Sequence, residues 1–458
     1  MKNLFILLTA LAILLSACEA VAPANIPAQT PIATEFFDPF NPPTATPTET
    51  LIPITPSAKI AQSSFSRDTS PSVPLEDLHT LVRGNNAFAL DLYQSMSEQD
   101  GNVFFSPYSI SLALAMAYAG ARGETESQMA NVLHFDLPQE HLHPAFNRLA
   151  LRLDENKAIA GENQELQLTV ANSLWAQNSY PFQQDFLDTI AINYGSGVRL
   201  VDFINNFDPL RLEINTWVRE QTKGKVNGLL PEGALDPSTR MVLVNAIYFK
   251  AYWLNDFTQP LHTWDEPFYL LDGSTIDVPM MHNGLWDFSY TKGTGWQAIE
   301  LPYVGFTTSM IIIVPDHGNF ELFEKEFDLA TYENILRVMS PNDVYLGLPK
   351  FSFGQNFGIV KQLSELGLKD AFDPSRANFS GMTETGKLAI GNILHEAHIV
   401  VDEEGTEAVA ATGIDFIEES GEPELDIELI IDRPFIFIIR DTVNSQILFI
   451  GRVLNPLE

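Results

Sequence analysis

Two stretches of the chain carry residue types that could bind a nucleotide or a metal ion. The stretch 381–388 reads Gly-Met-Thr-Glu-Thr-Gly-Lys-Leu and nearly matches a phosphate-binding loop. Leu388 stands where such a loop supplies a hydroxyl to magnesium, so we predict no nucleotide site there. His395 and His398 could form a metal pair, but residues three apart on a strand point to opposite faces. This spacing favours one core and one surface histidine, and we expect neither a metal nor a cofactor.

Residues for nucleophilic or acid–base catalysis form no recognisable pattern. The chain has no Gly-x-Ser-x-Gly nucleophile elbow, and its single cysteine is Cys18. A Glu/Asp pair for glycoside hydrolysis stays open as an alternative. With 59 Asp and Glu residues, however, coincidental carboxylate pairs are common. We therefore expect that the protein is not an enzyme.

A stretch near the C-terminus reads both as a loop and as a buried strand. It is rich in Gly and Ala and runs into the acidic segment 418–424, which is typical of a loop. Alternate side chains from residue 406 onward are small and then apolar: Thr406, Ala408, Ala410, Thr412, Ile414 and Phe416. Such a set fits a strand face against a core with little room. The double pattern indicates two structural states of one segment.

The composition limits the classes of partner. The chain has 458 residues, of which 45% are hydrophobic, enough for a sizeable core. Its 59 Asp and Glu against 26 Lys and Arg give a formal net charge of −33. Such a surface repels phosphate backbones and anionic lipid headgroups, and no basic cluster interrupts it. We therefore expect no nucleic-acid partner and no polyanionic cofactor such as heparin.

The first 18 residues read as a targeting segment. Lys2 gives a short positive start, and Leu4–Leu15 is apolar but too short for an ordinary membrane span. Leu-Ser-Ala-Cys at 15–18 resembles a bacterial lipoprotein box, which implies lipidation of Cys18 as the new N-terminus; the alternative is a plain secretory signal. No second cysteine exists for an internal disulfide. We expect export, with lipid anchoring at the bacterial cell surface or envelope, or secretion, and no other membrane contact.

Residues 19–74 are predicted to form a disordered tether and residues 75–458 one folded domain. The tether is rich in Pro, Thr and Ala and has no sustained periodicity. A helix is predicted within Leu75–Met96 from its apolar spacing. Ser106-Pro107 predicts a second helix start, because the hydroxyl can cap and Pro fits the first turn; this helix stops near Gly120 or Gly123.

Strand-like runs dominate the rest of the domain. They lie at 166–175, 241–250, 308–314, 344–353, 388–401, 435–440 and 447–453. A turn, Thr-Val-Asn-Ser at 442–445, joins the last two runs. Long strands and helices without strict βαβ alternation predict an α+β fold rather than a doubly wound parallel sheet.

Several blocks of sequence, in one order along the chain, resemble the serpin family. They cover the chain from about residue 76 to the C-terminus. Each block alone is moderately specific, and together they identify the chain as similar to serpins. The blocks are Asn102–Ile110, Asn245–Trp253, Glu403–Gly413, Arg433–Phe437 and Leu448–Pro456.

The resemblance implies a serpin fold, with a large central β-sheet, two smaller sheets, about nine helices and an exposed reactive loop. It implies a shutter, a buried cluster under the central strands, and a breach, where the loop first inserts. It assigns Ser106, Ser109, Asn245 and His395 to the shutter and Trp253 to the breach. It assigns the hinge of the reactive loop to Glu403, Gly405, Thr406, Ala408, Ala410 and Thr412.

The resemblance also implies inhibition of serine endopeptidases by a suicide-substrate mechanism. In serpins the cleaved loop inserts into the central sheet and traps the acyl-enzyme. The small hinge residues favour an inhibitory member of the family. We also expect a monomer. The alternative is a non-inhibitory serpin-fold binding or carrier protein.

The reactive bond is predicted from the usual family spacing. Counting from Glu403 puts it between Glu419 and Ser420. The loop is longer than in common family members, so the neighbouring bonds, after Glu418 and before Gly421, remain alternatives. A glutamate at this position favours a glutamate-preferring, chymotrypsin-like or subtilisin-like endopeptidase.

Overall fold

The structure is a computed structural model that describes residues 58–159, 166–226, 228–259, 262–385, 388–406 and 427–458. These residues lie in one compact unit that spans residues 52–458. Cys18, most of the predicted tether and the predicted loop residues 407–426 lie outside the described residues.

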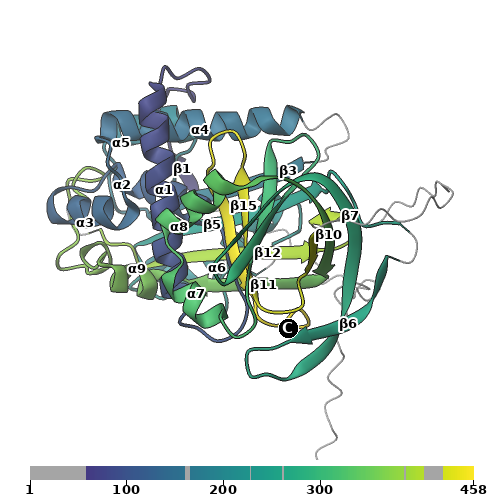
Figure 1. The fold of residues 1–458 in the computed structure, drawn as a ribbon. Helices are drawn as coiled ribbons and strands as arrows, with labels where there is room; N and C mark the ends of the chain where they lie inside the picture. Colours follow the sequence, from purple (N-terminus) through teal and green to yellow (C-terminus); the bar gives the residue numbers. More distant parts are fainter. Residues whose placement is uncertain (1–57, 160–165, 227, 260–261, 386–387, 407–426) are drawn as a thin grey trace, which may run out of the picture. The chain divides into compact units, whose positions relative to one another are not determined.

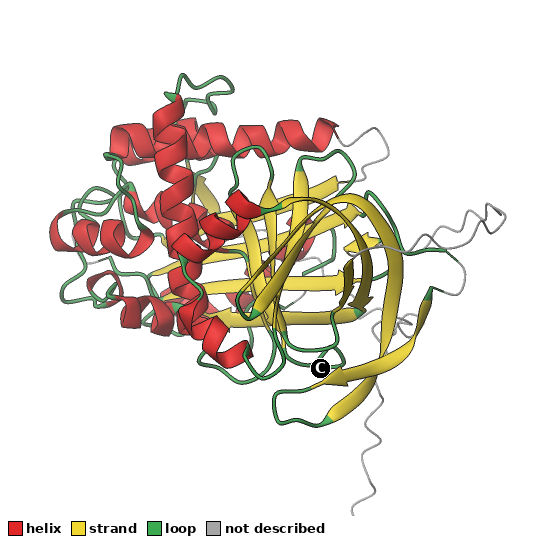
Figure 2. Ribbon diagram, in the orientation of Figure 1, coloured by secondary structure: helices red, strands yellow, loops and turns green. Residues whose placement is uncertain are grey.

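Most of the helices gather at one side of this unit and most of the strands at the other, as Figure 1 and Figure 2 show. The helices within the described ranges are α1 (Leu75–Met96), α2 (Pro107–Tyr118), α3 (Gly123–Leu133), α4 (Gln139–Ile159), α5 (Gln184–Tyr194), α6 (Phe203–Gln221), α7 (Phe320–Glu326), α8 (Leu329–Val338) and α9 (Val360–Leu366), with one 3₁₀ turn, η1 (Asp370–Phe372). The strands are β1 (Lys59–Ala61), β2 (Val103–Phe105), β3 (Leu166–Gln177), β4 (Val198–Val201), β5 (Met241–Tyr252), β6 (Thr263–Tyr269), β7 (Thr275–Gly293), β8 (Trp296–Pro302), β9 (Thr308–Pro315), β10 (Ser340–Pro349), β11 (Phe351–Gly358), β12 (Asn392–Val401), β13 (Gly405–Thr406), β14 (Ile427–Ile430), β15 (Phe435–Asp441) and β16 (Ile447–Val453).

The central sheet has the strand order β1-β4-β3-β5-β13-β12-β11. Its middle strand, β5, is buried on both faces, as expected for a continuous apolar run. One set of alternate residues, including Leu243 and Ile247, belongs to the main core. The other set, including Val242 and Val244, packs in a second cluster with Ile214 of α6. The sheet therefore separates α6 from the main body of the unit.

The remaining strands form one nine-stranded sheet. Its path is β14-β10-β7-β8-β9-β15-β16-β2, and β6 pairs with β7 off this path. The resemblance implied two smaller sheets in addition to the central one. The two groups of strands are joined here because β7 is 19 residues long: its first part pairs with β6 and its last residues with β8.

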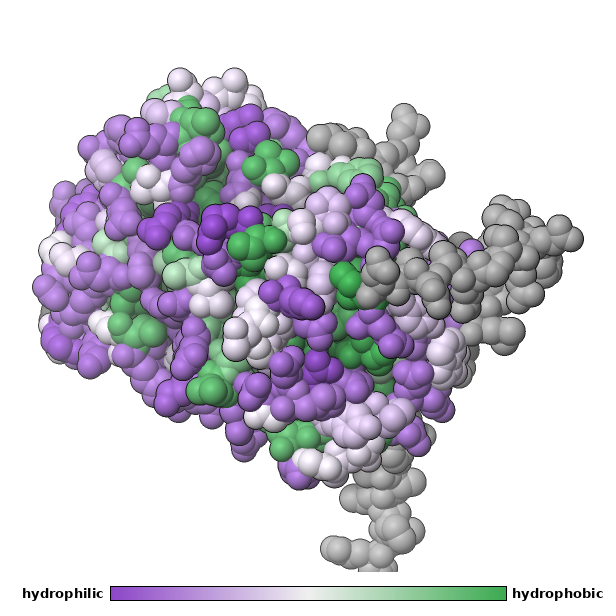
Figure 3. Space-filling model, in the orientation of Figure 1, coloured by the Kyte–Doolittle hydropathy of each residue, from purple (hydrophilic) through white to green (hydrophobic). Residues whose placement is uncertain are grey.

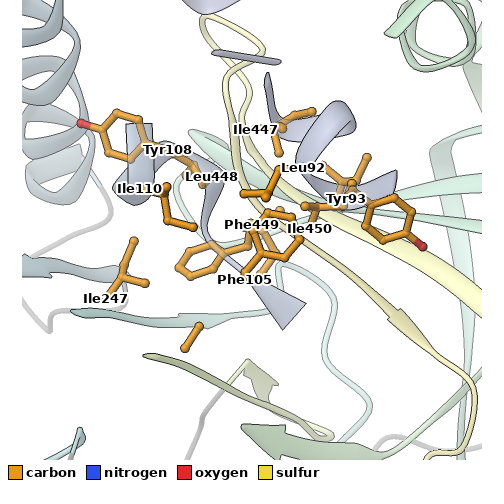
Figure 4. Close-up of a cluster of buried hydrophobic side chains, with 14 of the residues drawn as sticks. Leu92, Tyr93, Phe105, Tyr108, Ile110, Ile247, Ile447, Leu448, Phe449 and Ile450 are labelled. Atoms are coloured by element: carbon orange, nitrogen blue, oxygen red, sulfur yellow. The ribbon is translucent and has the colours of Figure 1, made fainter. Parts of the chain in front are cut away.

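The main core lies where the central sheet, the second sheet and the helices meet. Figure 4 shows part of it, with Leu92 from α1, Ile110 from α2, Phe105 from β2, Ile247 from β5 and Phe449 from β16 pointing toward one another. All five are at most 1% exposed. Burying a side chain of this size contributes about 1.5–3 kcal/mol, so this junction fixes α2 against β5.

The surface is mostly hydrophilic. Figure 3 shows one face on which hydrophobic residues form small, separate patches. Within the described ranges, no helix combines the length and apolar character that a membrane crossing needs.

The α+β fold predicted from the sequence is confirmed. The first helix, predicted within Leu75–Met96, is α1, which occupies that whole range, and the second begins at Pro107 with Ser106 as its N-cap. The strand predicted over 344–353 is wrong in one respect, because it breaks at Lys350 into β10 and β11, which belong to different sheets. The apolar alternation changes phase at this corner, from Val344, Leu346 and Leu348 before it to Phe351 and Phe353 after it, with Lys350 at the break.

The described structure begins before residue 75. Lys59–Ala61, inside the stretch predicted as a tether, forms β1 and pairs antiparallel with β4 at the edge of the central sheet. The next residues are also held: the Ser63 hydroxyl donates to Asp188 at 2.5 Å, and the backbone N–H of Asp68 donates to the carbonyl of Ile192 at 2.9 Å. The segment has too few apolar residues to signal this packing in the sequence.

Candidate functional site

The central sheet divides between β5 and β12. Val242–Ala246 of β5 pair in parallel with Asn392–Glu396 of β12. Farther along, β13 lies between the two strands and pairs antiparallel with each. Among the described residues, no ladder pair joins residues 247–250 to residues 397–400. We call this interval the fork; a strand that continued β13 through it would pair with both sides.

Thr406 is seated at the entrance to the fork. Only 1% of its surface is exposed, and its hydroxyl lies 2.7 Å from the Tyr303 hydroxyl. The Tyr303 ring in turn stacks on Trp253, with ring centroids 4.6 Å apart and planes at 9°. Before it, Gly405 approaches β5 so closely that a Cβ would lie 2.1 Å from the carbonyl oxygen of Ala251. Glycine is therefore required at this position.

Asp402 holds the turn that leads from β12 into β13. Its carboxylate accepts the backbone N–H of Glu404 at 3.0 Å and of Gly405 at 3.2 Å. Its carbonyl accepts the indole N–H of Trp253 at 3.0 Å. Burial raises the pKa of the Asp402 carboxyl to about 6, although the two backbone hydrogen bonds act in the opposite direction.

Glu403 is fixed by an ion pair across the corner between the two sheets. Its carboxylate accepts from the Lys350 ammonium at 2.7 Å and from the Thr263 hydroxyl at 3.1 Å. The side chains of Lys350 and Glu403 are only 16% and 27% exposed. Burial alone would raise the pKa of Glu403, but the hydrogen bonds and the Lys350 charge lower it on balance. Glu403 is therefore held as a carboxylate.

A buried hydrogen-bonded cluster joins β5 and β12 at the closed end of the fork. His395 of β12 and Asn245 of β5 are registered opposite each other, and His395 Nδ1 contacts Asn245 Oδ1. The Asn245 amide donates to the carbonyl oxygen of Ser109 at 2.8 Å. Ser106 donates its backbone N–H to His395 Nε2 at 3.1 Å and its hydroxyl to Leu448 at 2.7 Å. The start of α2 therefore bonds to both strands.

These contacts define the protonation of His395. Nε2 accepts from the Ser106 backbone N–H, so the ring proton must lie on Nδ1, where it is donated to Asn245. Complete burial lowers the pKa of His395 to about 3. The ring is neutral near pH 7, and a second proton would disrupt the contact with Ser106.

The predicted site residues fall into two groups. Glu403, Gly405, Thr406 and Trp253 lie together at the entrance of the fork. The four residues assigned to the shutter lie together at its closed end. The other predicted hinge and reactive-bond residues, and the lipidation site, lie outside the described residues; they are Ala408, Ala410, Thr412, Glu418, Glu419, Ser420, Gly421 and Cys18.

Sequence reasoning missed three residues of the entrance. Tyr303 and Thr263 lie far from the hinge in the chain, and no local pattern singles them out. Lys350 left a usable signal, because a lysine between Pro349 and Phe351 interrupts an otherwise apolar strand pattern. A charge at such a break is often paired, but its partner Glu403 could not be derived from spacing.

The histidine spacing gave a correct prediction. On β12, His395 is buried and His398 is exposed, so the two rings cannot share one ion. Within the described part of the chain, no group of three or more His, Cys, Asp or Glu side chains is arranged to hold a metal ion.

Comparison with known sequences identifies relatives over most of the chain. The family model described as "Serpin (serine protease inhibitor)" matches residues 83–456. The leukocyte elastase inhibitor of Xenopus tropicalis is 38% identical over 81% of this chain and 97% of its own length. An uncharacterized serpin-like protein of Methanosarcina acetivorans is 37% identical over 82% of this chain and 87% of its own.

Solved structures share the fold. The thermophilic serpin tengpin in its native state superposes with a TM-score of 0.75 at 27% identity, covering 87% of this chain and 99% of its own. Thyroxine-binding globulin in complex with thyroxine gives a TM-score of 0.71 at 31% identity, covering 83% of this chain and all of its own.

The ion pair at the entrance predicts a stability effect. Lys350→Gln leaves the Glu403 carboxylate half-buried without its cation, so we expect a loss of about 1–3 kcal/mol in urea-induced unfolding. Lys361→Gln is the matched control, because its pair with Glu365 is exposed and should contribute little. Equal urea midpoints for the two variants would contradict a stabilising role for Lys350.

Burial of neutral His395 predicts a pH dependence. The folded pKa of about 3 lies below the unfolded value of ~6.5, so the unfolded chain binds more protons between these limits. The stabilisation that comes from burying neutral His395 is complete above pH ~6.5. Below this pH the free energy of unfolding falls toward pH 3, by up to about 1.4 kcal/mol per pH unit. His395→Gln removes this titration, so between these two pH values the free energy of unfolding should fall less steeply than in the unchanged protein, by up to about 1.4 kcal/mol per pH unit. Parallel curves for the two proteins would refute the assignment.

Proposed function

The chain belongs to the serpin family, and we propose that it inhibits serine endopeptidases as a suicide substrate. One observation carries this proposal: Thr406, the first small residue of the hinge, already lies between β5 and β12 at the entrance of the fork. Loop insertion into the central sheet is the mechanism of inhibitory serpins, and the fork supplies the place for it.

The register of β13 indicates which loop residues would meet which side chains. Thr406 is opposite Ala251 on β5. Continuing this register puts Ala408 opposite Phe249 and Ala410 opposite Ile247, on the face that belongs to the main core. Large aromatic and aliphatic neighbours leave little room on this face. The alternation of small residues in the sequence supports insertion in this register.

Full insertion would replace one parallel ladder with two antiparallel ladders. The same register puts Thr412 opposite Asn245 and Ile414 opposite Leu243, so the contact of Asn245 with His395 must break. Each net backbone hydrogen bond contributes about 0.5–1.5 kcal/mol, and burying Ile414 adds about 1.5–3 kcal/mol. We infer that the inserted state is the more stable one and that the native state is metastable.

Cleavage of the loop is the step that releases the hinge. The protease serine attacks the reactive carbonyl, the peptide bond breaks, and the new acyl ester links the protease to the N-terminal side of the loop. Insertion then moves the attached protease with the loop and displaces the protease's catalytic triad and oxyanion hole. Water therefore no longer hydrolyses the ester. The protease stays trapped only if the loop inserts faster than water hydrolyses the acyl ester.

We keep the reactive bond between Glu419 and Ser420 as part of the proposal, with Glu418 and Gly421 marking the neighbouring bonds. A glutamate side chain needs a basic or polar specificity pocket in the protease. This supports a glutamate-preferring, chymotrypsin-like or subtilisin-like endopeptidase as the partner. A trypsin-like protease is disfavoured, because its acidic pocket would repel the acidic side chain.

A non-inhibitory binding protein is the second candidate. Thyroxine-binding globulin, with its bound thyroxine, has a similar fold. The small side chains of the hinge favour inhibition. We also propose that the protein acts as a monomer held at the bacterial envelope through a lipid on Cys18, or secreted, so that its targets are extracytoplasmic.

A protease panel tests the proposed activity. We expect at least one serine endopeptidase of the classes above to form a complex that survives SDS, because the acyl ester is covalent. Mass spectrometry of the released C-terminal peptide should place its first residue at Ser420. Cleavage of the loop by every reactive protease without any stable complex would overturn the inhibitory function.

A bulky hinge residue should convert the inhibitor into a substrate. Thr406→Arg places a long charged side chain in the space beside Tyr303. An added barrier of only ~1.4 kcal/mol slows insertion tenfold, and deacylation then competes. We expect cleaved protein and free protease in place of the complex. Val443→Arg, on an exposed turn, is the control and should still trap the protease. Undiminished trapping by Thr406→Arg would contradict the insertion mechanism.

A further inference from the structure

A polar cavity of about 400 Å³ lies at the edge of the central sheet, far in sequence from the hinge. One wall is the segment from Ile60 to Arg67, which leads out of β1. The other walls are the turn between α5 and β4, the adjoining part of β3, and Trp217 and Gln221 of α6. Its size falls within the range of small-molecule sites.

The cavity has a positive lining in a strongly negative protein. Arg67 and Arg199 line it, and no Asp or Glu belongs to its lining. The chain as a whole carries a formal charge of −33. Hydroxyls and amides of Ser66, Ser173, Ser196 and other residues complete the lining with hydrogen-bonding groups. Two guanidinium groups beside neutral donors are the usual recognition elements for a carboxylate, sulfate or phosphate.

Both arginines are held in place. The Arg199 guanidinium lies 5.1 Å from the ring centre of Trp175 and 4.9 Å from that of Trp217, and its Nε donates to Ser173 at 3.1 Å. The Arg67 Nε donates to the Asn147 side chain at 2.7 Å. Burial lowers the pKa of Arg199, yet an arginine remains charged at neutral pH. These two side chains have therefore already lost their conformational entropy before any ligand binds.

A second cavity of about 280 Å³ adjoins the first. The two share Arg67, Asn172, Tyr194 and Ser196 in their linings. Beyond these residues six apolar side chains line the second cavity, Leu112, Met116, Ala150, Leu153, Leu168 and Val170, together with the polar residues Tyr108, Thr169 and Asn193. One carboxylate, Asp154, also belongs to this lining.

We propose that the joined cavities bind an anionic amphiphile, such as a medium-chain carboxylate. The head group lies against Arg67 and Arg199, and the hydrocarbon chain passes Tyr194 into the second cavity. Neither a free inorganic anion nor a neutral hydrocarbon would use both halves of the site.

The ligand would lie one residue from the shutter. Asn172 lines both cavities, and its side-chain oxygen accepts from the Asn245 amide. Asn245 also holds His395 across the closed end of the fork. Resting on the proposed function, we expect bound ligand to change the rate of loop insertion after cleavage. An unchanged rate with ligand bound would remove this coupling and leave the binding site intact.

Isothermal titration calorimetry of the full chain with decanoate tests the site without any protease. We expect one saturable site, no binding of decyltrimethylammonium, and an affinity that rises from butyrate to decanoate by up to about fourfold per methylene. Ala150→Trp, which fills the second cavity, should abolish this dependence on chain length. Circular dichroism and melting curves check that each variant is folded.

Charge variants identify the head-group site. Arg67→Gln and Arg199→Gln should each weaken decanoate binding by about tenfold or more, and Arg67→Lys should restore part of the affinity. Arg83→Gln on α1 removes an exposed positive charge elsewhere and should leave affinity unchanged. Absence of saturable binding, equal binding of the cationic amphiphile, or unchanged affinity in both folded Gln variants would overturn the proposal.

Discussion

The short parallel ladder between β5 and β12 is the constraint on which the rest of the structure depends. Five residues of each strand are registered along it, and beyond them the strands part around β13. A parallel pairing is slightly less stable per residue than an antiparallel one. At the place where a new strand would enter, β5 and β12 are therefore joined by the weaker, parallel kind of pairing. The contact between His395 and Asn245 reinforces this pairing.

The two ends of the fork are held by different physical means. At the entrance, Glu403 is fixed by the Lys350 charge, and Asp402 caps the turn with two backbone hydrogen bonds. At the closed end the contacts are neutral and completely buried, with His395 kept uncharged by desolvation. Salt weakens the ion pair at the entrance. Acid acts on both ends, because Asp402 at the entrance has a pKa of about 6 and His395 at the closed end a pKa of about 3. As the pH falls, the entrance is therefore affected first.

Local patterns predicted much of the fold and part of the site. Local patterns sufficed for a helix within Leu75–Met96, the cap at Ser106 and the opposite faces of His395 and His398, because each depends on residues within one turn or strand. The pairing of Lys350 with Glu403 and the corner between β10 and β11 depend on contacts between distant segments. The ordering of β1 depends on an open sheet edge at β4, which its own composition does not reveal.

A crystal structure of the protein nicked in its loop tests the central claim most directly. The account predicts a new strand between β5 and β12, in the register that puts Ala408 opposite Phe249, with Asn245 and His395 no longer in contact. A nicked protein in which Val242–Ala246 still pair with Asn392–Glu396, as they do in the intact chain, would contradict it.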